Sequence, residues 1–465
     1  MSNQVQALVV GAGISGLTTA FALQKSGIPT VIVEAASRPG GVIQSVQRDG
    51  YLLECGPQSF SGNADITLLC RDLDILDQRV LADPKAPRYV LIDGKLQNVP
   101  MGPGLLASSL LGGGTRLAIL RDLLGKSRAP DSDESVASFI RRKFSVTLLD
   151  RLVGPFVSGI YAGDPEKLSL RAAFPILHEA ELASGSVIRG MIPVMKARKA
   201  RRGNAPREKA TLQTFRAGNE TLIRALAKKL GDRLKLDAEL ILFEPLDPGR
   251  EAKAPRFRVT IRTPRGEEQL ETERVVFAVP TNVAAKILAK LNPAFETELA
   301  PIEYAGVAVV SLGYRKEDVG HSLAGFGFLV PRASGLSDLG TVWNSSLFPG
   351  RAPEGHALLT SFVGGATNAE ALQKSQDELT SQVHREIAPL LAIRKEPVFC
   401  NVTIWPRALP QYNLGHTERL ATLEKVRASF PGLHFAGNYL NGPAIGTCVE
   451  QALKVAEEIR ISFAN

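Results

Sequence analysis

Three glycines near the N-terminus have the spacing of a loop that binds the phosphates of a dinucleotide. Gly11, Gly13 and Gly16 follow the apolar run 6–10, which predicts a buried strand, and open a helical pattern over 16–26. The first glycine allows a tight turn, the second lets the backbone approach a pyrophosphate, and the third lets helix and strand pack closely. The residues predicted to bind the phosphates are Gly11, Ala12, Gly13, Ile14, Ser15 and Gly16.

An acidic residue follows Gly16 by 18 positions, about the spacing at which dinucleotide-binding folds place the acid that binds a ribose. Glu34 comes directly after the β-branched run 30–33, which predicts a second strand, and Gly27 ends the helix between the two strands. A carboxylate there accepts hydrogen bonds from ribose hydroxyls and repels a 2′-phosphate, which disfavours NADP. The N-terminal segment is therefore predicted to be a βαβ unit for NAD or FAD.

The residues after Glu34 separate these two cofactors. Arg38, Pro39, Gly40 and Gly41 form an Arg-x-Gly-Gly motif, whose glycines let the backbone pass beside a long extended cofactor. With this motif the sequence resembles the glutathione-reductase-type FAD fold, in the branch that contains amine oxidases and phytoene desaturases. The resemblance implies non-covalent FAD, held here by Glu34, Ala35, Arg38 and Gly41.

The C-terminal end carries a second part of the same resemblance. Gly437 and Asn438 precede a glycine-containing run and a helical pattern from 447 to 459. In this fold the last helix points its N-terminus at the pyrimidine end of the flavin, where the helix dipole stabilises negative charge. Asn438 stands where the branch often has an acid. The implied cofactor residues are Gly437, Asn438, Ile445, Gly446, Thr447 and Cys448, with Leu240, Val279 and Trp405 elsewhere in the chain.

Composition and charge restrict the class of protein. The 465 residues carry a formal net charge of +8, and the run 196–209 holds most of the excess positive charge. This run could be a solvated loop, or it could bind an anionic membrane surface or a nucleic acid. The four cysteines form no Cys-x-x-Cys pair and no histidine cluster accompanies them, so neither a metal site nor a disulfide is predicted. The uncharged stretch 98–115 is too poor in apolar residues to span a membrane, and no signal peptide is recognised, which favours an intracellular protein.

The pattern of elements predicts one nucleotide domain interrupted by two inserted units. Residues 100–200 are mostly helical, whereas strand-like runs lie at 234–243, 257–262, 274–279, 307–314, 325–330, 357–363 and 433–436. Residues 247–255, rich in proline and charge, predict a hairpin loop. The expected fold class is α/β plus α+β: a Rossmann-like FAD domain (1–78, 215–285 and 415–465), a β-rich substrate domain (79–97, 200–214 and 286–414) and a helical domain (98–199).

The sequence contains no second Gly-x-Gly-x-x-Gly motif that could bind a nicotinamide cofactor. Gly112, Gly113 and Gly114 do not follow a strand-like run, so they do not form a dinucleotide loop. Electrons must then enter from an organic substrate and leave to oxygen or another acceptor, which favours an oxidase over a reductase.

Longer segments are similar to one family of flavin oxidases. Residues 56–60 read GPQSF, 159–165 read GIYAGDP, 168–169 read LS and 362–365 read FVGG. Together with Gly437, Asn438, Gly442 and Gly446 they resemble the protoporphyrinogen IX oxidase family, over nearly the whole chain. The resemblance implies oxidation of protoporphyrinogen IX to protoporphyrin IX in haem biosynthesis, with oxygen as acceptor and hydrogen peroxide formed. It also implies a helical domain in peripheral contact with a membrane, a homodimer, no nucleic-acid partner, and a place in the bacterial cytoplasm at the inner face of the cell membrane.

The same resemblance assigns residues to the substrate. Arg88 would pair with a propionate, because a guanidinium can hold a carboxylate bidentately. Gly159 would lie against the macrocycle, and Leu329, Val342 and Phe362 would sandwich its rings. Asn63 is a weaker candidate for orienting substrate. No general base is expected, since the flavin takes the hydride and pyrrole protons can leave to solvent. Further implied cofactor residues are Gly56, Pro57, Gln58 and Ser59.

Three alternatives remain at this stage. A coproporphyrinogen III oxidase of the same family would need a second cluster of cations for its four propionates. An amine oxidase would carry an aromatic cage and often a cysteine bound to flavin, whereas Cys448 lies among small residues at a helix start. The non-enzyme alternative is a protein like the Rab GDP-dissociation inhibitors, which lack the intact pair of glycine motifs that this chain has.

Overall fold

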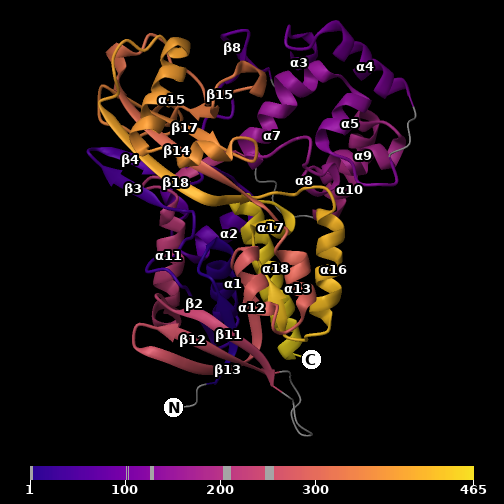
Figure 1. The fold of residues 1–465 in the computed structure, drawn as a ribbon, viewed down its shortest axis with the longest axis vertical. Coiled ribbons are helices and arrows are strands. Elements are labelled where there is room, and N and C mark those ends of the chain that lie inside the picture. The colour runs from indigo at the N-terminus through magenta and orange to yellow at the C-terminus, as the bar shows by residue number, and fades with distance from the viewer. Residues whose placement is uncertain are drawn as a thin grey trace.

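The computed structural model describes residues 4–464, apart from 101, 103, 126–129, 203–210 and 247–255. Figure 1 shows three parts: a lower unit near both chain ends, a sheet unit at the upper left and a helical unit at the upper right. The lower unit combines indigo, magenta and yellow segments, so residues far apart in the sequence build it together.

The lower unit is built on a sheet with the order β10, β2, β1, β13, β12, β11, in which β19 also pairs with β13. Neighbours in the half from β10 to β13 are parallel, as is the β13–β19 pair, whereas β11, β12 and β13 are antiparallel. The strands are β1 (Gln4–Val10), β2 (Thr30–Val33), β10 (Leu234–Lys235), β11 (Glu239–Leu246), β12 (Arg256–Thr263), β13 (Gly266–Phe277) and β19 (Leu433–Phe435).

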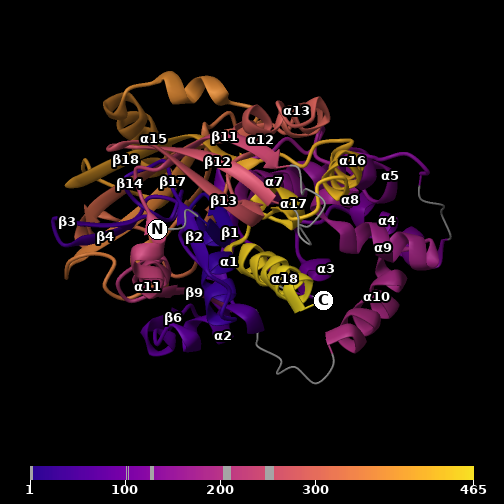
Figure 2. The ribbon, with the colours of Figure 1, turned by 90° about the horizontal axis from the view of Figure 1, so that it is seen from below.

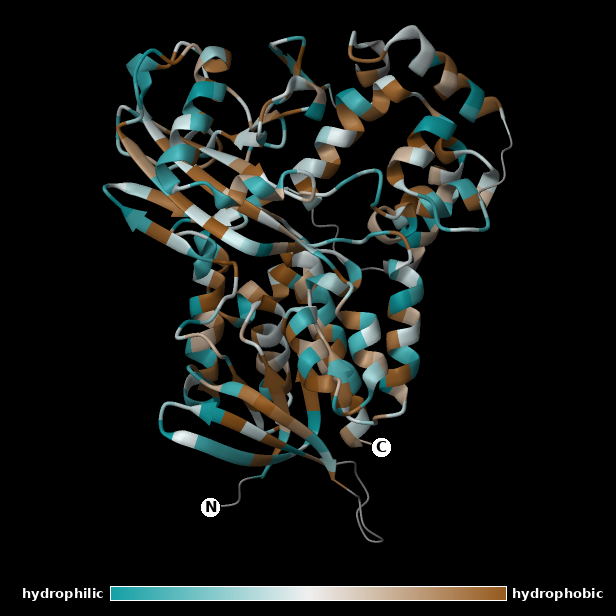
Figure 3. Ribbon diagram, in the orientation of Figure 1, coloured by the Kyte–Doolittle hydropathy of each residue, from teal (hydrophilic) through white to brown (hydrophobic). Residues whose placement is uncertain are grey.

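Helices cover both faces of this sheet because successive side chains of a strand point to opposite sides. Ala7 and Val9 of β1 pack in one buried cluster, whereas Leu8 and Val10 pack in the other. Figure 2 shows the helices around the central strands, and Figure 3 shows brown, hydrophobic residues along these strands. The first face meets α1 (Ile14–Lys25), α2 (Ala64–Asp72), α11 (Glu220–Leu230) and α18 (Ile445–Ala464); the second meets α12 (Thr281–Leu288), α13 (Pro293–Leu299) and α16 (His416–Ala428).

The upper sheet has the order β18, β14, β17, β16, β15, β7, β8. Its strands β14 and β17 are largely buried, and α15 (Gln376–Leu391) packs on the sheet through Leu379, Val383, Ile387 and Leu391. The strands are β7 (Arg88–Ile92), β8 (Lys95–Asn98), β14 (Tyr304–Arg315), β15 (Gly327–Leu329), β16 (Asp338–Val342), β17 (His356–Gly364) and β18 (Phe399–Pro410). Around it lie η4 (Lys316–Asp318), η5 (Arg332–Ser334), α14 (Asn344–Leu347) and η6 (Ala369–Gln373).

Short elements join the two sheets. β3 (Ser45–Arg48) and β4 (Tyr51–Glu54) form a hairpin, and β9 (Leu212–Phe215) pairs with both β5 (Phe60–Ser61) and β6 (Arg79–Leu81). The remaining short helices are η1 (Leu76–Gln78), η3 (Gly231–Arg233) and α17 (Asn438–Asn441).

Every element between β8 and β9 in the described part of the chain is helical. These helices are α3 (Gly104–Ala107), α4 (Gly113–Leu124), α5 (Val136–Lys143), α6 (Val146–Leu148), the π-helical η2 (Leu149–Val153), α7 (Gly154–Tyr161), α8 (Leu170–Ala173), α9 (Pro175–Ser184) and α10 (Val187–Arg202). None of the described helices is long and apolar enough to cross a membrane.

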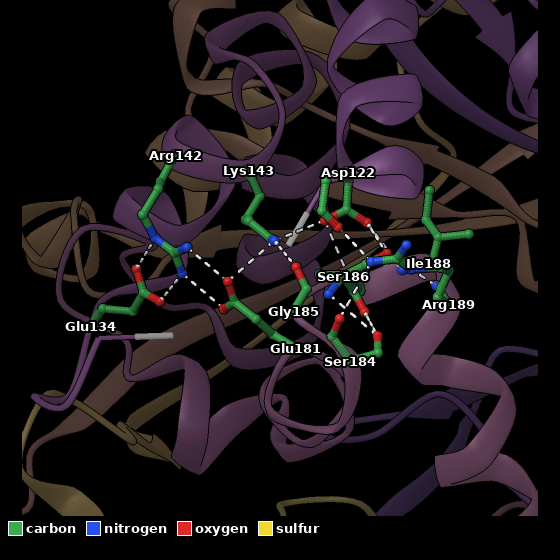
Figure 4. A network of polar contacts seen from close by, with 12 residues as sticks. Asp122, Glu134, Arg142, Lys143, Glu181, Ser184, Gly185, Ser186, Ile188 and Arg189 are labelled. Carbon is green, nitrogen blue, oxygen red and sulfur yellow. Dashed lines mark hydrogen bonds and ion pairs between the residues drawn. The ribbon is translucent and has the colours of Figure 1, made fainter. Parts of the chain in front are cut away.

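A buried ion network holds α4, α5, α9 and α10 together (Figure 4). The ammonium group of Lys143 lies 2.8 Å from Asp122 and 3.2 Å from Glu181, and all three side chains are almost fully buried. Arg142 donates to both oxygens of Glu181 and also pairs with Glu134. Every buried charge in the network therefore faces a charge of opposite sign.

Two expectations about elements are wrong or incomplete. The run 234–243 is not one strand, because Asp237 adopts a positive φ of 50° and separates β10 from β11. The basic run is not a loop throughout, since residues 196–202 continue α10; Arg207 and Lys209 lie outside the described residues. The loop predicted at 247–255 also lies outside them, while the strands on either side pair antiparallel.

Candidate active site

One continuous cavity of about 1950 Å³ extends from the glycine loop after β1 to the strands β7, β15, β16 and β17 of the upper sheet. The lower unit supplies one end and the upper and helical units supply the other. A cavity of this length can hold a dinucleotide and a second molecule beside it.

The N-terminus of α1 faces the first end of the cavity. Ile14 and Ser15 line the cavity, and no side chain caps the helix at its N-cap residue, Gly13. The first amide groups of the helix are therefore available to an anion. A Cβ on Gly13 would point into open space, whereas a Cβ on Gly16 would overlap the carbonyl oxygen of Gly11. Gly13 thus leaves room for phosphates and Gly16 allows the helix to pack.

Glu34 lies at the same end, immediately after β2. One carboxylate oxygen accepts a hydrogen bond from the amide of Ala12 at 2.7 Å and the other from the amide of Ala36 at 2.9 Å. Each oxygen keeps a lone pair for a ribose hydroxyl, and Glu34 itself lines the cavity. These features fit the adenosine half of FAD.

The N-terminus of α18 faces the middle of the cavity through Ile445, Thr447 and Cys448. Two side chains fix the preceding segment, α17. The hydroxyl of Tyr412 donates to the carbonyl oxygen of Asn438, and His416 Nε2 lies 2.9 Å from the carbonyl oxygen of Tyr439. Burial raises the pKa of the Cys448 thiol to about 11, so this cysteine stays protonated at neutral pH.

Residues 56–59 form another wall of the cavity. The indole of Trp405 donates to the carbonyl oxygen of Cys55 at 2.6 Å. The amide of Gln58 donates to the carbonyl oxygens of Glu54 and Gly56, and Asn344 donates to Gln58 Oε1. The wall that would flank a flavin ring is therefore fixed by the upper sheet as well as by its own loop.

The cavity brings together most residues predicted for the cofactor. Those that line it are Gly11, Gly13, Ile14, Ser15, Glu34, Ala35, Gly41, Gly56, Pro57, Gln58, Ser59, Leu240, Val279, Trp405, Gly437, Asn438, Ile445, Thr447 and Cys448. Ala12, Gly16, Arg38 and Gly446 are not among the lining residues. Ala12 and Gly16 support the glycine loop, Gly446 packs on Asn63, and Arg38 donates to the carbonyl oxygens of Pro39 and Gly41.

Asn63 does not line the cavity either. Its side-chain oxygen caps α2 by accepting from the amide of Ile66, and its nitrogen donates to the carbonyl oxygen of Gly446 at 3.1 Å. Both ends of this amide are thus used to join α2 to the start of α18. The geometry gives Asn63 a packing role and no contact with a substrate.

The five residues predicted for the substrate all line the far half of the cavity. They are Arg88, Gly159, Leu329, Val342 and Phe362, and they come from four strands and one helix. A Cβ on Gly159 would come within 2.6 Å of a methyl group of Leu329, so only glycine lets α7 approach β15 this closely. The guanidinium of Arg88 lies 5.7 Å from the ring centre of Phe326.

Several lining residues were not predicted from the sequence. Leu152, Phe156 and Ile160 extend the apolar wall from η2 and α7, and Tyr304 and Arg407 line the cavity near Trp405. The helical spacing of Leu152, Phe156 and Ile160 could have indicated one face, but nothing in their spacing shows that the face is a cavity wall. No histidine is among the described lining residues, and the only acids are Glu34 and Glu239.

Comparisons with known proteins agree with this geometry. Residues 14–460 match the family of flavin-containing amine oxidoreductases. The chain is 37% identical to a chloroplastic protoporphyrinogen oxidase of Nicotiana tabacum, over 98% of this chain and 85% of that protein. It is 28% identical to the coproporphyrinogen III oxidase of Staphylococcus aureus, over 97% and 98% of the two chains.

Solved structures share the fold. A structure from Exiguobacterium sp. 255-15, which bears a provisional protoporphyrinogen oxidase name, superposes with a TM-score of 0.80 at 25% identity, over 98% of this chain and 99% of that one. Cyclohexylamine oxidase from Brevibacterium oxydans reaches 0.69 at 18% identity, over 99% and 100% of the chains, and shows the fold alone. The chain therefore belongs to the flavin-containing amine oxidoreductase family, in the branch that includes the protoporphyrinogen oxidases, and its cofactor is FAD.

Proposed function

We propose that this chain oxidises protoporphyrinogen IX to protoporphyrin IX, with oxygen as the electron acceptor. The observation that carries the proposal is a large apolar slot beside the cofactor end of the cavity, with a guanidinium at one wall. A macrocycle with apolar faces and two propionates on one edge matches such a slot. The names of the relatives support the same substrate.

The residues of the chain contribute binding and orientation. When bound, FAD would supply hydride acceptance; three two-electron transfers, each followed by reduction of one O2 molecule to hydrogen peroxide, would account for the six electrons removed. Arg88 would pair with a propionate and fix the rotation of the macrocycle. Leu329, Val342 and Phe362 would hold its faces and exclude water. The lining residues that the structure describes include no histidine to accept a proton, so we expect pyrrole protons to leave to solvent.

The charge of the slot favours two propionates over four. Arg88 is the one cation that the described lining residues of α7, β7, β15, β16 and β17 contribute. The other described lining cations are Arg262 on β12, Lys286 on α12, Lys290 just after that helix, and Arg407 on β18. A coproporphyrinogen would bring carboxylates to several edges of the slot, where apolar side chains would leave them unpaired.

We also propose a peripheral contact with the cytoplasmic face of a bacterial membrane. Leu117, Leu120 and Leu124 of α4 are 50%, 54% and 80% exposed and lie on one face of the helix. Ile192 and Met195 of α10 are exposed as well, next to the basic end of that helix. An apolar stripe with nearby cations is the combination that binds an anionic bilayer surface.

The test is the rate at which porphyrin fluorescence appears in air from protoporphyrinogen IX, with coproporphyrinogen III in parallel. We expect faster turnover of the first substrate with one peroxide for each two electrons. Arg88→Ala should raise KM by about tenfold or more, because a paired carboxylate loses its partner, while Arg151→Ala on the neighbouring η2 should not. A preference for coproporphyrinogen III, or an unchanged KM in Arg88→Ala, would contradict the proposal.

A further inference from the structure

A buried carboxylate lies behind the substrate slot, at a break in the regular pairing of β16 and β17. Asp338 is 2% exposed and pairs with Val363, whereas Gly340 pairs with Phe362, so Leu339 is the extra residue of a β-bulge. Leu339, Gly340 and Phe362 all line the cavity. The bulge therefore shapes the wall that the substrate would touch.

Where the bulge interrupts the backbone hydrogen bonds between β16 and β17, the carboxylate of Asp338 accepts hydrogen bonds from both strands. One oxygen accepts from the amide of Gly340 at 3.0 Å and from the amide of Phe362 at 3.3 Å, so a single atom bridges the two strands. The other oxygen accepts from the hydroxyl of Thr341 at 2.6 Å, and this hydroxyl lies 2.6 Å from that of Ser361. Without this side chain, the buried amide of Gly340 and the part-buried amide of Phe362 would both lose an acceptor at the slot wall.

The outer side of the bulge is also fixed. Glu386 of α15 accepts from the backbone amides of Ser337 and Asp338 and from the hydroxyl of Ser337. On the other side, a Cβ on Gly340 would come within 2.8 Å of the carbonyl oxygen of Phe328 and 3.1 Å of Leu329, so glycine lets the bulge lie close against β15. The bulge is thus held between α15 and β15.

We propose that Asp338 is a positioning residue for the substrate: its carboxylate holds the β16 bulge and so sets the places of Leu339 and Phe362 in the slot wall. This inference rests on the proposed function for its natural substrate. Leu339 and Phe362 would contact the macrocycle equally before and during hydride transfer, so their displacement weakens binding and leaves the chemical step unchanged.

The test compares holoprotein variants in steady-state oxidation of protoporphyrinogen IX. Asp338→Ala should raise KM about tenfold, because the displaced wall loses contact with the substrate, with kcat changed by less than about twofold. Asp338→Asn should restore most of the affinity, because its oxygen can still accept from both amides and its nitrogen can donate to Thr341. Thr341→Val removes one donor to the carboxylate and keeps the side-chain shape, so it should give a smaller rise in KM. It serves as the test variant if Asp338→Ala does not fold.

The matched control is Asp318→Ala. Asp318 is also buried, at 8% exposure, and pairs with Lys395 in the same unit, but it does not line the cavity. Its removal should leave KM unchanged. The inference would be overturned by an unchanged KM in Asp338→Ala, or in Thr341→Val if that variant is used instead. An equal rise in the KM of Asp318→Ala would also overturn it.

Binding of protoporphyrin IX, followed by quenching of flavin fluorescence, separates this inference from the proposed function. If wild type does not oxidise the porphyrinogen but binds the porphyrin, and Asp338→Ala weakens that binding while Asp318→Ala does not, the function fails and the positioning role holds. If wild type neither oxidises nor binds, both fail.

Discussion

Gly13 and Gly16 are three residues apart, yet a side chain at each would meet different surroundings. A Cβ on Gly13 has nothing within 4 Å, because the space beyond it is the cavity, whereas a Cβ on Gly16 would overlap the backbone of Gly11. We expect Gly13→Val to fold but to lose FAD, since the valine occupies the space of the pyrophosphate. Gly16→Val should fail to fold.

The measurement is the flavin content of purified protein together with its circular dichroism. Gly114→Ala, whose new Cβ also meets nothing within 4 Å, is the control and should retain full flavin occupancy. Full occupancy in a folded Gly13→Val protein would place the phosphates elsewhere.

Asp338 also makes stability depend on pH. Burial raises its pKa from 3.8 to about 6, with Glu386 adding to the rise, although hydrogen bonds from Thr341, Gly340 and Phe362 lower it. The folded protein therefore holds this proton more tightly than the unfolded chain, so the stabilisation is present below about pH 4 and is lost as pH rises through about 6.

Asp338→Asn does not titrate, so its stability relative to wild type should increase between about pH 4 and pH 7, by up to about 3 kcal/mol. Melting temperatures of the two holoproteins over this range measure the difference. A difference that does not change with pH would mean that the carboxylate keeps its ordinary pKa.

The elements of the helical unit depend on charges that no local pattern of the sequence indicates. Asp122, Lys143 and Glu181 come from three different helices, and their side chains are 0%, 6% and 0% exposed. Burial alone would raise the pKa of Asp122 and of Glu181, but hydrogen bonds from Lys143 and Arg142 help to leave both below their usual values. The stabilisation from these carboxylates is present above about pH 4 and is lost as pH falls through their lowered pKa values.

Lys143→Met should lower the free energy of unfolding by about 3–5 kcal/mol, because it leaves two buried carboxylates with one fewer cation. Urea titration followed by tryptophan fluorescence and far-ultraviolet circular dichroism measures the loss. The exposed pair of Lys454 and Glu450 is the comparison, and Lys454→Met should cost no more than about 1 kcal/mol. Similar losses at both sites would contradict a special role for the buried network.

Local patterns of the sequence were sufficient for the elements that bind the dinucleotide. The run 30–33 predicts β2 at its observed bounds, and the glycine motif predicts both the turn and the open space at Gly13. In contrast, the bulge at Asp338 depends on Phe362 and Glu386, which are 20 to 50 residues away along the chain. Lys143 likewise depends on Asp122 and Glu181, at similar separations. Turn chemistry and periodicity act over a few residues, so they do not indicate such pairs.

At the scale of the whole molecule, the cavity lies between units that must be held in register. Arg351 of the upper unit lies 2.8 Å from Glu54 at the end of β4, and both side chains are 2% exposed. Glu54 also accepts from the amide of Asn219, whose side chain donates to the carbonyl oxygen of Pro57 in the cavity wall. The ion pair thus joins the upper sheet to the wall that would flank the flavin.

Burial raises the pKa of Glu54 even though Arg351 lowers it, which shows how costly this carboxylate would be without its partner. Arg351→Met should therefore lower the free energy of unfolding by about 3–5 kcal/mol and weaken FAD binding. The double variant with Glu54→Gln should lose less than the sum of the two single variants, because no unpaired charge remains. The control cycle on the exposed pair of Lys25 and Asp72 should give a coupling of at most about 1 kcal/mol. If both cycles gave the same small coupling, the ion pair would not hold the two units in register, and packing with the hydrogen bonds from Trp405 and Asn344 would do so.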